Sequence, residues 1–397
     1  MQHKKLPRIL YLSDVPVELS SAGATLLYRL LEYYPKDKLM IIQGVGVNEN
    51  QPRIPGVEYH TYKPAIDRLR YTRFAKYTKS LFVASQFMLS AKAKRTIHAF
   101  KPDVILTVSI RLMWVNAYRL SKRLHIPLYV VLHDDWLITE NYGRWQKKLV
   151  ELFEKMYLHA SARFCISPTM EKYYYSMYGV HGDVIYPSRG KTDRLLPVSV
   201  NDKKNGLKFC YAGSLFTGDF GGMLDRISGI IEKMGGELHV FSYWNKELLS
   251  AHHNLVKKHV TFHPFMHSSD LMEKMNKEMD VAILLNSFDH EKAFMYNFSS
   301  KLVDYSSAGL PVFFYGPASA GSSAWAISIG YQAIVTEADP GKLEKTLTAI
   351  HNCEFRKSLA MQIREHAQHE FSYETSEKTF LEAISEWQRA RIKNNHH

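Results

Sequence analysis

The most constraining feature of this sequence is an alternation of short, continuously apolar runs with longer amphipathic stretches. In the first half the apolar runs are RILYLS (Arg8–Ser13), LMIIQG (Leu39–Gly44), DVILTV (Asp103–Val108), PLYVVLH (Pro127–His133), RFCIS (Arg163–Ser167) and DVIYP (Asp183–Pro187). Between them lie helical patterns such as ATLLYRLLEYY and RWQKKLVELFEKMYLHA. Strands that are apolar throughout and separated by helices are typical of a parallel sheet covered on both faces.

A polar, charged segment without periodicity, SRGKTDRLLPVSVNDKKNG (Ser188–Gly206), interrupts the alternation, which then restarts. The second set of runs is LKFCYAG (Leu207–Gly213), ELHVFS (Glu237–Ser242), HVTFH (His259–His263), DVAILL (Asp280–Leu285), PVFFYG (Pro311–Gly316) and QAIVT (Gln332–Thr336). A chain of 397 residues is too long for one ordinary core and suits two domains. The sequence therefore predicts two doubly wound α/β domains, at 1–190 and 207–375, with a linker at 191–206 and a terminal helix and tail at 376–397.

Residues that follow the strands are the first candidates for a site, because ligands of open α/β sheets bind beyond the carboxyl ends of the strands. A Ser-Ser-Ala-Gly-Ala turn after the first strand contains Ser21 and Gly23. We interpret it as a loop lining a cleft between the domains, or as a plain strand-to-helix turn. Gly213 and Ser214, after the first strand of the second domain, either present backbone N–H groups to a diphosphate or form a turn without a ligand.

His133, Asp134 and Asp135 follow another buried strand, in PLYVVLHDDW. Polar side chains at this position favour contacts with sugar hydroxyls. Two alternatives stay open for the acids. They bind a metal, as paired acids do in metal-dependent sugar transferases, or one of them caps the next helix.

The stretch YNFSSKLVDYSSAGLPVFFYG (Tyr296–Gly316) places two serines, Lys301 and Asp304 at the start of a short helix. A helix start offers unpaired N–H groups and the positive end of the helix dipole, which suit an anion. Gly309 fits a left-handed position after the helix, and Pro311 blocks its continuation. This geometry predicts a ligand that carries phosphate.

Several reaction classes lack their signatures. The sequence has no GxGxxG or GxxxxGK[ST] loop, no GxSxG and no HExxH, so we expect no dinucleotide or ATP loop, no serine hydrolase and no metal site. Its cysteines, Cys165, Cys210 and Cys353, are far apart and form no CxxC pair, which indicates a reducing compartment. With no apolar run long enough for a membrane span and no signal-like N-terminus, we expect a cytoplasmic protein.

The net charge of +12 is concentrated in residues 68–101, which contain nine lysines and arginines and no acid. Aromatic and aliphatic side chains are interleaved with these bases. A basic, aromatic, helical segment suits an anionic membrane surface, and the alternative is a solvated helix pair with an ordinary buried face. No recognition motif accompanies the charge, so we expect no nucleic-acid partner.

The stretch at 296–316 resembles the retaining GT-B glycosyltransferases of the family 4 type, whose second domain commonly carries N-x-x-S-K-L-x-E-Y-x-x-x-G-x-P-V. The matching residues are Asn297, Ser300, Lys301, Leu302, Tyr305, Gly309, Pro311 and Val312. YAGSL, VLHDD and the final helix, which in these enzymes crosses back to the first domain, are supporting matches. The resemblance implies a GT-B architecture, in which two Rossmann-like domains face a central cleft, over nearly the whole chain.

The resemblance also implies roles for individual residues. The second domain binds the nucleotide-sugar donor through the backbone and side chains of Gly213, Ser214, Asn297, Ser299, Ser300, Lys301 and Asp304. Asp304 stands where the family has a ribose-binding Glu, and Tyr296 stands where it often has a further Glu. The family's basic residue after the GSL turn is missing here, which leaves the diphosphate to Lys301 or Arg189.

In the first domain, His133 matches the residue beside the donor sugar, and Ser21 and Gly23 fall where the acceptor loop lies. We expect His133, Asp134 and Lys301 to act in catalysis. The prediction is therefore a retaining, metal-independent glycosyltransferase that acts on a lipid-linked or surface-polysaccharide acceptor, with residues 68–101 on an anionic membrane. A sugar-nucleotide epimerase of GT-B fold and a GT-B-like subunit that binds without catalysis are the alternatives.

Overall fold

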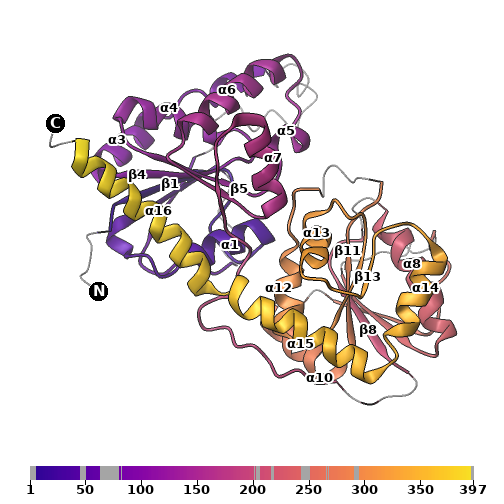
Figure 1. Ribbon diagram of the computed structural model, residues 1–397. Coiled ribbons are helices and arrows are strands. Elements are labelled where there is room, and N and C mark those ends of the chain that lie inside the picture. The colour runs from indigo at the N-terminus through magenta and orange to yellow at the C-terminus, as the bar shows by residue number, and fades with distance from the viewer. Residues whose placement is uncertain are drawn as a thin grey trace. The chain divides into compact units, whose positions relative to one another are not determined.

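The computed structural model describes residues 6–44, 51–62, 80–81, 83–200, 202, 206–215, 219–242, 251–264, 266, 268–289 and 295–394. The side chains of residues 138, 139, 268 and 386–394 are not described. The chain forms two compact units (Figure 1). Unit 1 contains residues 1–186 and 376–397, and unit 2 contains residues 187–375.

Unit 1 is built on a parallel sheet with the strand order β3-β2-β1-β4-β5-β6-β7. Its strands are β1 (Ile9–Ser13), β2 (Leu39–Gln43), β3 (Glu58–Thr61), β4 (Val104–Val108), β5 (Leu128–Leu132), β6 (Ala162–Cys165) and β7 (Asp183–Val184). All residues of β1, β2, β4 and β5 are buried, as expected of strands covered on both faces. The strands run in register at their carboxyl ends, where Ser13 pairs with Gln43 and Val108 with Val131.

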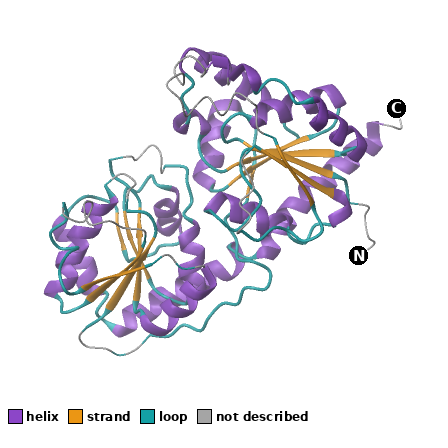
Figure 2. Ribbon diagram, turned by 180° about the vertical axis from the view of Figure 1, so that it is seen from behind, coloured by secondary structure: helices purple, strands orange, loops and turns teal. Residues whose placement is uncertain are grey.

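Helices cover both faces of this sheet (Figure 2). They are α1 (Ala22–Leu31), α3 (Ala91–Phe100), α4 (Met113–Leu124), α5 (Trp136–Thr139), α6 (Gln146–His159) and α7 (Pro168–Tyr178), with 3-10 turns η1 (Lys36–Lys38) and η3 (Gly143–Trp145). The limits of α7 follow from local chemistry: the Ser167 hydroxyl accepts the Met170 N–H at 3.1 Å, and Gly179 ends the helix at φ +68°.

Unit 2 is built on a second parallel sheet, in the order β10-β9-β8-β11-β12-β13. Its strands are β8 (Lys208–Ala212), β9 (Glu237–Phe241), β10 (Val260–His263), β11 (Val281–Leu285), β12 (Val312–Tyr315) and β13 (Ile334–Val335). The flanking helices are α8 (Phe220–Lys233), α10 (Ser268–Glu278), α12 (Ser300–Ser307), α13 (Gly321–Ser328), α14 (Pro340–Ala349) and α15 (Cys353–Glu370). Each sheet reverses its strand order beside its first strand, as in doubly wound folds.

The last helix, α16 (Tyr373–Asn394), begins in unit 2 and belongs to unit 1 from Ser376 onward. In unit 1 the ring of Phe380 lies 5.6 Å from that of Phe164 on β6, and the Tyr129 hydroxyl on β5 donates to the carbonyl of Ala383 at 3.2 Å. These contacts cover one face of the sheet with a distant part of the chain.

Every strand expected from an apolar run is present, within a few residues of the expected limits, and the expectation of two doubly wound sheets is confirmed. The sequence interpretation missed β3. This strand lies at the edge of its sheet and none of its residues is buried, so it lacks the apolar run that marked the other strands. The first part of the basic segment, residues 68–79, lies outside the described residues.

Candidate active site

The short helix α12 forms where the motif predicted it. Its N-cap, Ser299, has extended backbone angles and makes no side-chain hydrogen bond to the helix, while its N–H donates to the Ser322 hydroxyl at 2.8 Å. After the helix, Gly309 adopts φ +72°, which confirms the expected left-handed position. A methyl group at residue 309 would lie 2.6 Å from the carbonyl oxygen of Pro197, so glycine is also required by close packing of the preceding segment.

Tyr305 fixes α12 against the end of β8. Its buried hydroxyl accepts the N–H of Ala212 at 2.9 Å and lies 3.3 Å from the carbonyl oxygen of the same residue. Lys301 is one helical turn before Tyr305 and shares its face of the helix. The pair of bonds at Tyr305 therefore holds Lys301 beside the turn that follows β8.

The Lys301 side chain lies directly against Gly213. Gly213 has φ +146°, and the position that a Cβ would take is already occupied by the ammonium nitrogen and Cε of Lys301. The ammonium also lies over the ring of Tyr211, 5.1 Å from its centroid. The Tyr211 hydroxyl in turn donates to the carbonyl of Ser214 at 2.8 Å. The structure thus brings together Gly213, Ser214 and Lys301, which the sequence identified in two separate motifs.

The electrostatics of Lys301 reflect this packing. Burial lowers the pKa of its ammonium to about 8, and the nearby Asp304 carboxylate opposes the shift. At neutral pH the group is still a cation, held beside the first turn of a helix. Both features suit a ligand that carries negative charge. Asn297, Ser299 and Ser300 lie half-buried at the same helix start.

Arg189, the other cation predicted to bind diphosphate, is buried at the end of α15. Its guanidinium donates to the carbonyls of Ala367 at 2.7 Å and Gln368 at 3.2 Å, and its N–H donates to the carbonyl of Phe371 at 2.9 Å. These bonds satisfy carbonyl groups that a helix end leaves without partners. Its role in donor binding stays a prediction, with Lys301 the better placed of the two.

In unit 1, Gly23 and His133 are in contact. Gly23 lies in the first turn of α1, for which Ser21 is the N-cap. A methyl group at residue 23 would lie 3.1 to 3.3 Å from three atoms of the His133 imidazole. The glycine thus allows the helix start to approach the face of the ring. Nδ1 of His133 lies 3.2 Å from an Asp134 carboxylate oxygen, which orients the imidazole.

The two acids after His133 have different surroundings. Asp135 is buried, and its carboxylate accepts the Leu137 N–H at 3.0 Å as the N-cap of α5 and the Tyr174 hydroxyl at 2.9 Å. Burial raises its pKa. The helix-cap alternative is therefore correct for Asp135. Asp134 is the partner of His133.

Sequence reasoning missed Asp14 and Arg111, which follow the neighbouring strands β1 and β4 of unit 1. An Asp14 oxygen accepts the N–H groups of Leu112 at 3.0 Å and Met113 at 2.7 Å, and burial raises its pKa. Arg111 has φ +52°, and its carbonyl accepts the indole N–H groups of Trp114 at 2.8 Å and Trp136 at 2.7 Å.

These bonds impose a backbone conformation that arginine adopts at a cost, and they leave the Arg111 side chain exposed near the carboxyl edge of the sheet. The rule that polar residues after parallel strands are site candidates, applied to Ser13-Asp14, would have identified the acid. No sequence signal marks the strained position of Arg111.

Residues 49–188 match the family model Glycosyltransferase Family 4. The matched segment includes β4, β5 and the residues from His133 to Asp135. The chain is a glycosyltransferase of GT-B fold. This confirms the resemblance that the helix-start motif suggested.

Solved structures with similar folds support the same architecture at low sequence identity. The α,α-trehalose-6-phosphate synthase from Burkholderia multivorans has a TM-score of 0.68 and 10% identity, with 98% of each chain covered. The apo form of the lipopolysaccharide outer core galactosyltransferase WaaB has a TM-score of 0.66 and 13% identity, covering 95% of this chain and 99% of that one.

A trehalose-6-phosphate structure from E. coli, bound with UDP-2-fluoro glucose, has a TM-score of 0.63 and 10% identity, covering 95% and 98% of the two chains. A search of curated protein sequences found no match.

Proposed function

We propose that this glycosyltransferase transfers a sugar from a nucleotide-sugar donor with retention of anomeric configuration and without a metal ion. The observation that carries the proposal is the Lys301 ammonium, held against Gly213 at the start of α12 by the bonds of Tyr305. The E. coli structure with bound UDP-2-fluoro glucose, a fold relative of this chain, supports a nucleotide-sugar donor.

On the donor side, the departing nucleoside diphosphate gains negative charge as the bond to the sugar breaks. A cation and backbone N–H groups that are already in place stabilise this charge without reorganisation. Lys301 supplies the cation and the start of α12 supplies the N–H groups. We assign Asp304, three residues after Lys301 on α12, to hydrogen bonds from the ribose hydroxyls, and Gly213 to the close approach of the Lys301 side chain.

On the sugar side, we assign His133 to contacts with the donor sugar and Asp134 to the orientation of its imidazole. The transition state of glycosyl transfer is oxocarbenium-like, so groups that hold the sugar hydroxyls contribute more than a strong base. Retention by attack on the same face requires no dedicated enzymatic nucleophile. We assign the start of α1, where Gly23 lies against His133, to contacts with the acceptor.

We assign the acceptor to the lipid-linked or surface-polysaccharide class, used at the cytoplasmic face of a membrane. The basic segment 68–101 supports this assignment, and WaaB, a lipopolysaccharide galactosyltransferase, is among the fold relatives. Among the described residues, no helix is both long and apolar enough to span a bilayer. Charge reversal at Arg68, Arg70 and Arg73 should reduce sedimentation with anionic liposomes, and unchanged sedimentation would count against a membrane contact of this segment.

The test of the proposed reaction is the release of nucleoside diphosphate from UDP-, GDP-, ADP- and CDP-sugars by the purified protein. We expect slow release from one donor, and loss of this release in Lys301→Met. Lys357→Met, which removes an exposed lysine from α15, is the matched control and should behave like wild type. Release that survives in Lys301→Met contradicts the donor site. Binding without release, or conversion of the donor to an epimer, contradicts the transferase.

A further inference from the structure

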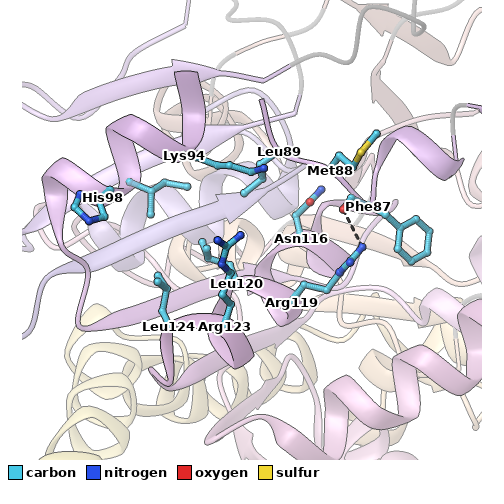
Figure 3. Close-up of a pocket in the computed structure, with 11 residues that line it drawn as sticks. Phe87, Met88, Leu89, Lys94, His98, Asn116, Arg119, Leu120, Arg123 and Leu124 are labelled. Carbon is cyan, nitrogen blue, oxygen red and sulfur yellow. Dashed lines mark hydrogen bonds between the residues drawn. The ribbon is translucent and has the colours of Figure 1, made fainter. Parts of the chain in front are cut away.

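A cavity of about 490 Å³ opens between α4 and the segment that leads into and forms α3 (Figure 3). Leu89, Lys94 and His98 lie along one wall, and Leu120, Arg123 and Leu124 of α4 lie along the other. This volume is within the range of sites for small organic ligands. All of these residues belong to unit 1.

The walls of the cavity are held together by contacts between the two segments. The Arg119 guanidinium donates to the Phe87 carbonyl at 2.9 Å and lies over the Phe87 ring, 5.5 Å from its centroid. The Asn116 amide donates to the carbonyl of Gln86. By contrast, α3 itself buries one side chain of its ten residues, Ile97. Most side chains of α3 are therefore not buried in the core.

The apolar part of the cavity reaches solvent. Phe87, Leu89, Ile97 and Leu120 form apolar lining, while Met88 is 67% exposed and Leu124 is 40% exposed at its mouth. Exposed methionine and leucine side chains next to an apolar hollow are a feature of surfaces that bind a partner or a lipid.

The charges around the cavity have one sign. Its ionisable lining side chains are Lys94, His98, Arg119 and Arg123, and no acid lines it among the described residues. None of the three lysine and arginine groups forms an ion pair with a described residue. From residue 68 to 133 the sequence has 13 lysines and arginines and a single acid, Asp103, which accepts the backbone N–H of Arg8 at 2.8 Å.

A second, more open hollow of about 480 Å³ adjoins the first between α4 and α6. It is lined by Tyr118, Arg119, Lys122, Arg123, Leu152 and Lys155. Arg119 and Arg123 therefore stand on the ridge between two hollows, with further lysines beside them. This arrangement concentrates positive charge at one rim of the apolar cavity.

We propose that the α3–α4 cavity binds a single molecule of an anionic phospholipid. The acyl chain enters between Leu89 and Leu120, and the phosphate lies on Arg119 and Arg123. A soluble anion would use the arginines and leave the apolar walls unfilled, whereas an uncharged lipid would leave the basic rim without a partner. The anionic phospholipid satisfies both. Part of this site lies in the segment 68–101, so the inference deepens the membrane contact proposed above, while it does not depend on the transfer reaction.

The test measures binding of a lysophosphatidylglycerol with one acyl chain to the full chain, below the critical micelle concentration and at physiological ionic strength. Leu120→Trp fills the cavity and keeps every charge, and Arg123→Gln removes a phosphate contact while keeping the Arg119 bond to Phe87 that holds the walls together. We expect each to weaken binding by about tenfold or more, which corresponds to about 1.4 kcal/mol or more. Lys147→Gln removes the same charge from an exposed residue of α6 that lines neither hollow and should change affinity by less than about twofold.

Several results would overturn the proposal. They are no binding to wild type, unchanged binding by Leu120→Trp, equal binding of the zwitterionic lysophosphatidylcholine, or an equal loss in the Lys147→Gln control. Circular dichroism checks the fold of each variant, and the arginine variant decides the outcome if Leu120→Trp does not fold. Nucleoside diphosphate binding by the same variants reports on the donor site separately, so a failure of one proposal is distinguishable from a failure of the other.

Discussion

Replacing Lys301 with Met should stabilise unit 2 and weaken donor binding at the same time. The methionine keeps an apolar stem of similar length against Gly213 and Tyr211 and removes the charge. Selection for stability alone would not favour a buried ammonium at position 301. The opposite signs of the two effects are what distinguish a binding residue from a structural one.

The magnitude follows from the pKa of the ammonium, which burial lowers from 10.5 to about 8. At about 1.4 kcal/mol per pKa unit, keeping this group charged in the folded protein costs about 3 kcal/mol at pH 7. The methionine forfeits the interaction of the cation with the Tyr211 ring, which offsets about 1 kcal/mol of the gain. We therefore expect the free energy of unfolding to rise by about 2 kcal/mol, or about 4 to 8 °C in the Tm of unit 2.

The pH dependence of the free energy of unfolding tests independently whether Lys301→Met stabilises the protein. Because the folded-state pKa lies below the unfolded value, the unfolded chain binds more protons between about pH 8 and 10.5, and wild-type stability rises with pH across that window. The advantage of the methionine variant should therefore be full at pH 7 and fall by more than half at pH 9.5. Urea denaturation of both proteins at the two pH values measures this difference.

The reasoning would be refuted if Lys301→Met destabilised the protein at pH 7, or if its advantage were the same at both pH values. Nucleoside diphosphate should raise the Tm of wild type and leave that of the variant nearly unchanged, because ligand binding to the native state adds to stability. Lys357→Met, at an exposed position on α15, should change neither stability nor its response to nucleotide.

Three further substitutions test how α12 is packed and what it binds. Tyr305→Phe leaves the buried N–H of Ala212 without its acceptor and should cost about 1 to 3 kcal/mol in urea denaturation, together with weaker nucleotide binding; a loss below about 0.5 kcal/mol would mean that the hydroxyl does not hold α12. Asp304→Ala should weaken nucleoside diphosphate binding by about tenfold in calorimetry with little change in stability, and unchanged affinity would remove Asp304 from the ribose site. Gly309→Ala places a methyl group 2.6 Å from the Pro197 carbonyl oxygen at φ +72° and should cost about 2 kcal/mol or more, whereas a neutral result would contradict the close packing there.

Much of the fold could be predicted because buried parallel strands leave a strong signal. Strands such as β4 and β11 are buried along their whole length, so their apolar runs stand out from the helices between them. The strand β3 could not be found this way, because it is an edge strand with exposed and half-buried residues. The end of α12 was predictable because Gly309 and Pro311 act locally on the backbone.

The sequence identified many residues of the candidate site, but it did not show which of them contact one another. The motif indicated Lys301, but its position against Gly213 depends on the sheet, in which β8 and β11 are neighbours, and on the Tyr305 bonds to Ala212. Likewise, the contact of Gly23 with the His133 ring joins residues that are far apart in the sequence. The left-handed conformation of Arg111 depends on two tryptophan indoles and cannot be inferred from local propensity.

The central claim, that α12 and Lys301 form the binding site for the nucleoside diphosphate of a sugar donor, is tested most directly by calorimetric titration of UDP, GDP, ADP and CDP into the full chain at pH 7. We predict that one of them binds wild type, and that Lys301→Met weakens this binding by about 10- to 150-fold, as expected for the loss of about 1.5 to 3 kcal/mol of charged hydrogen bonding. Binding of equal strength to the two proteins, or no binding of any of the four to wild type, would contradict the account.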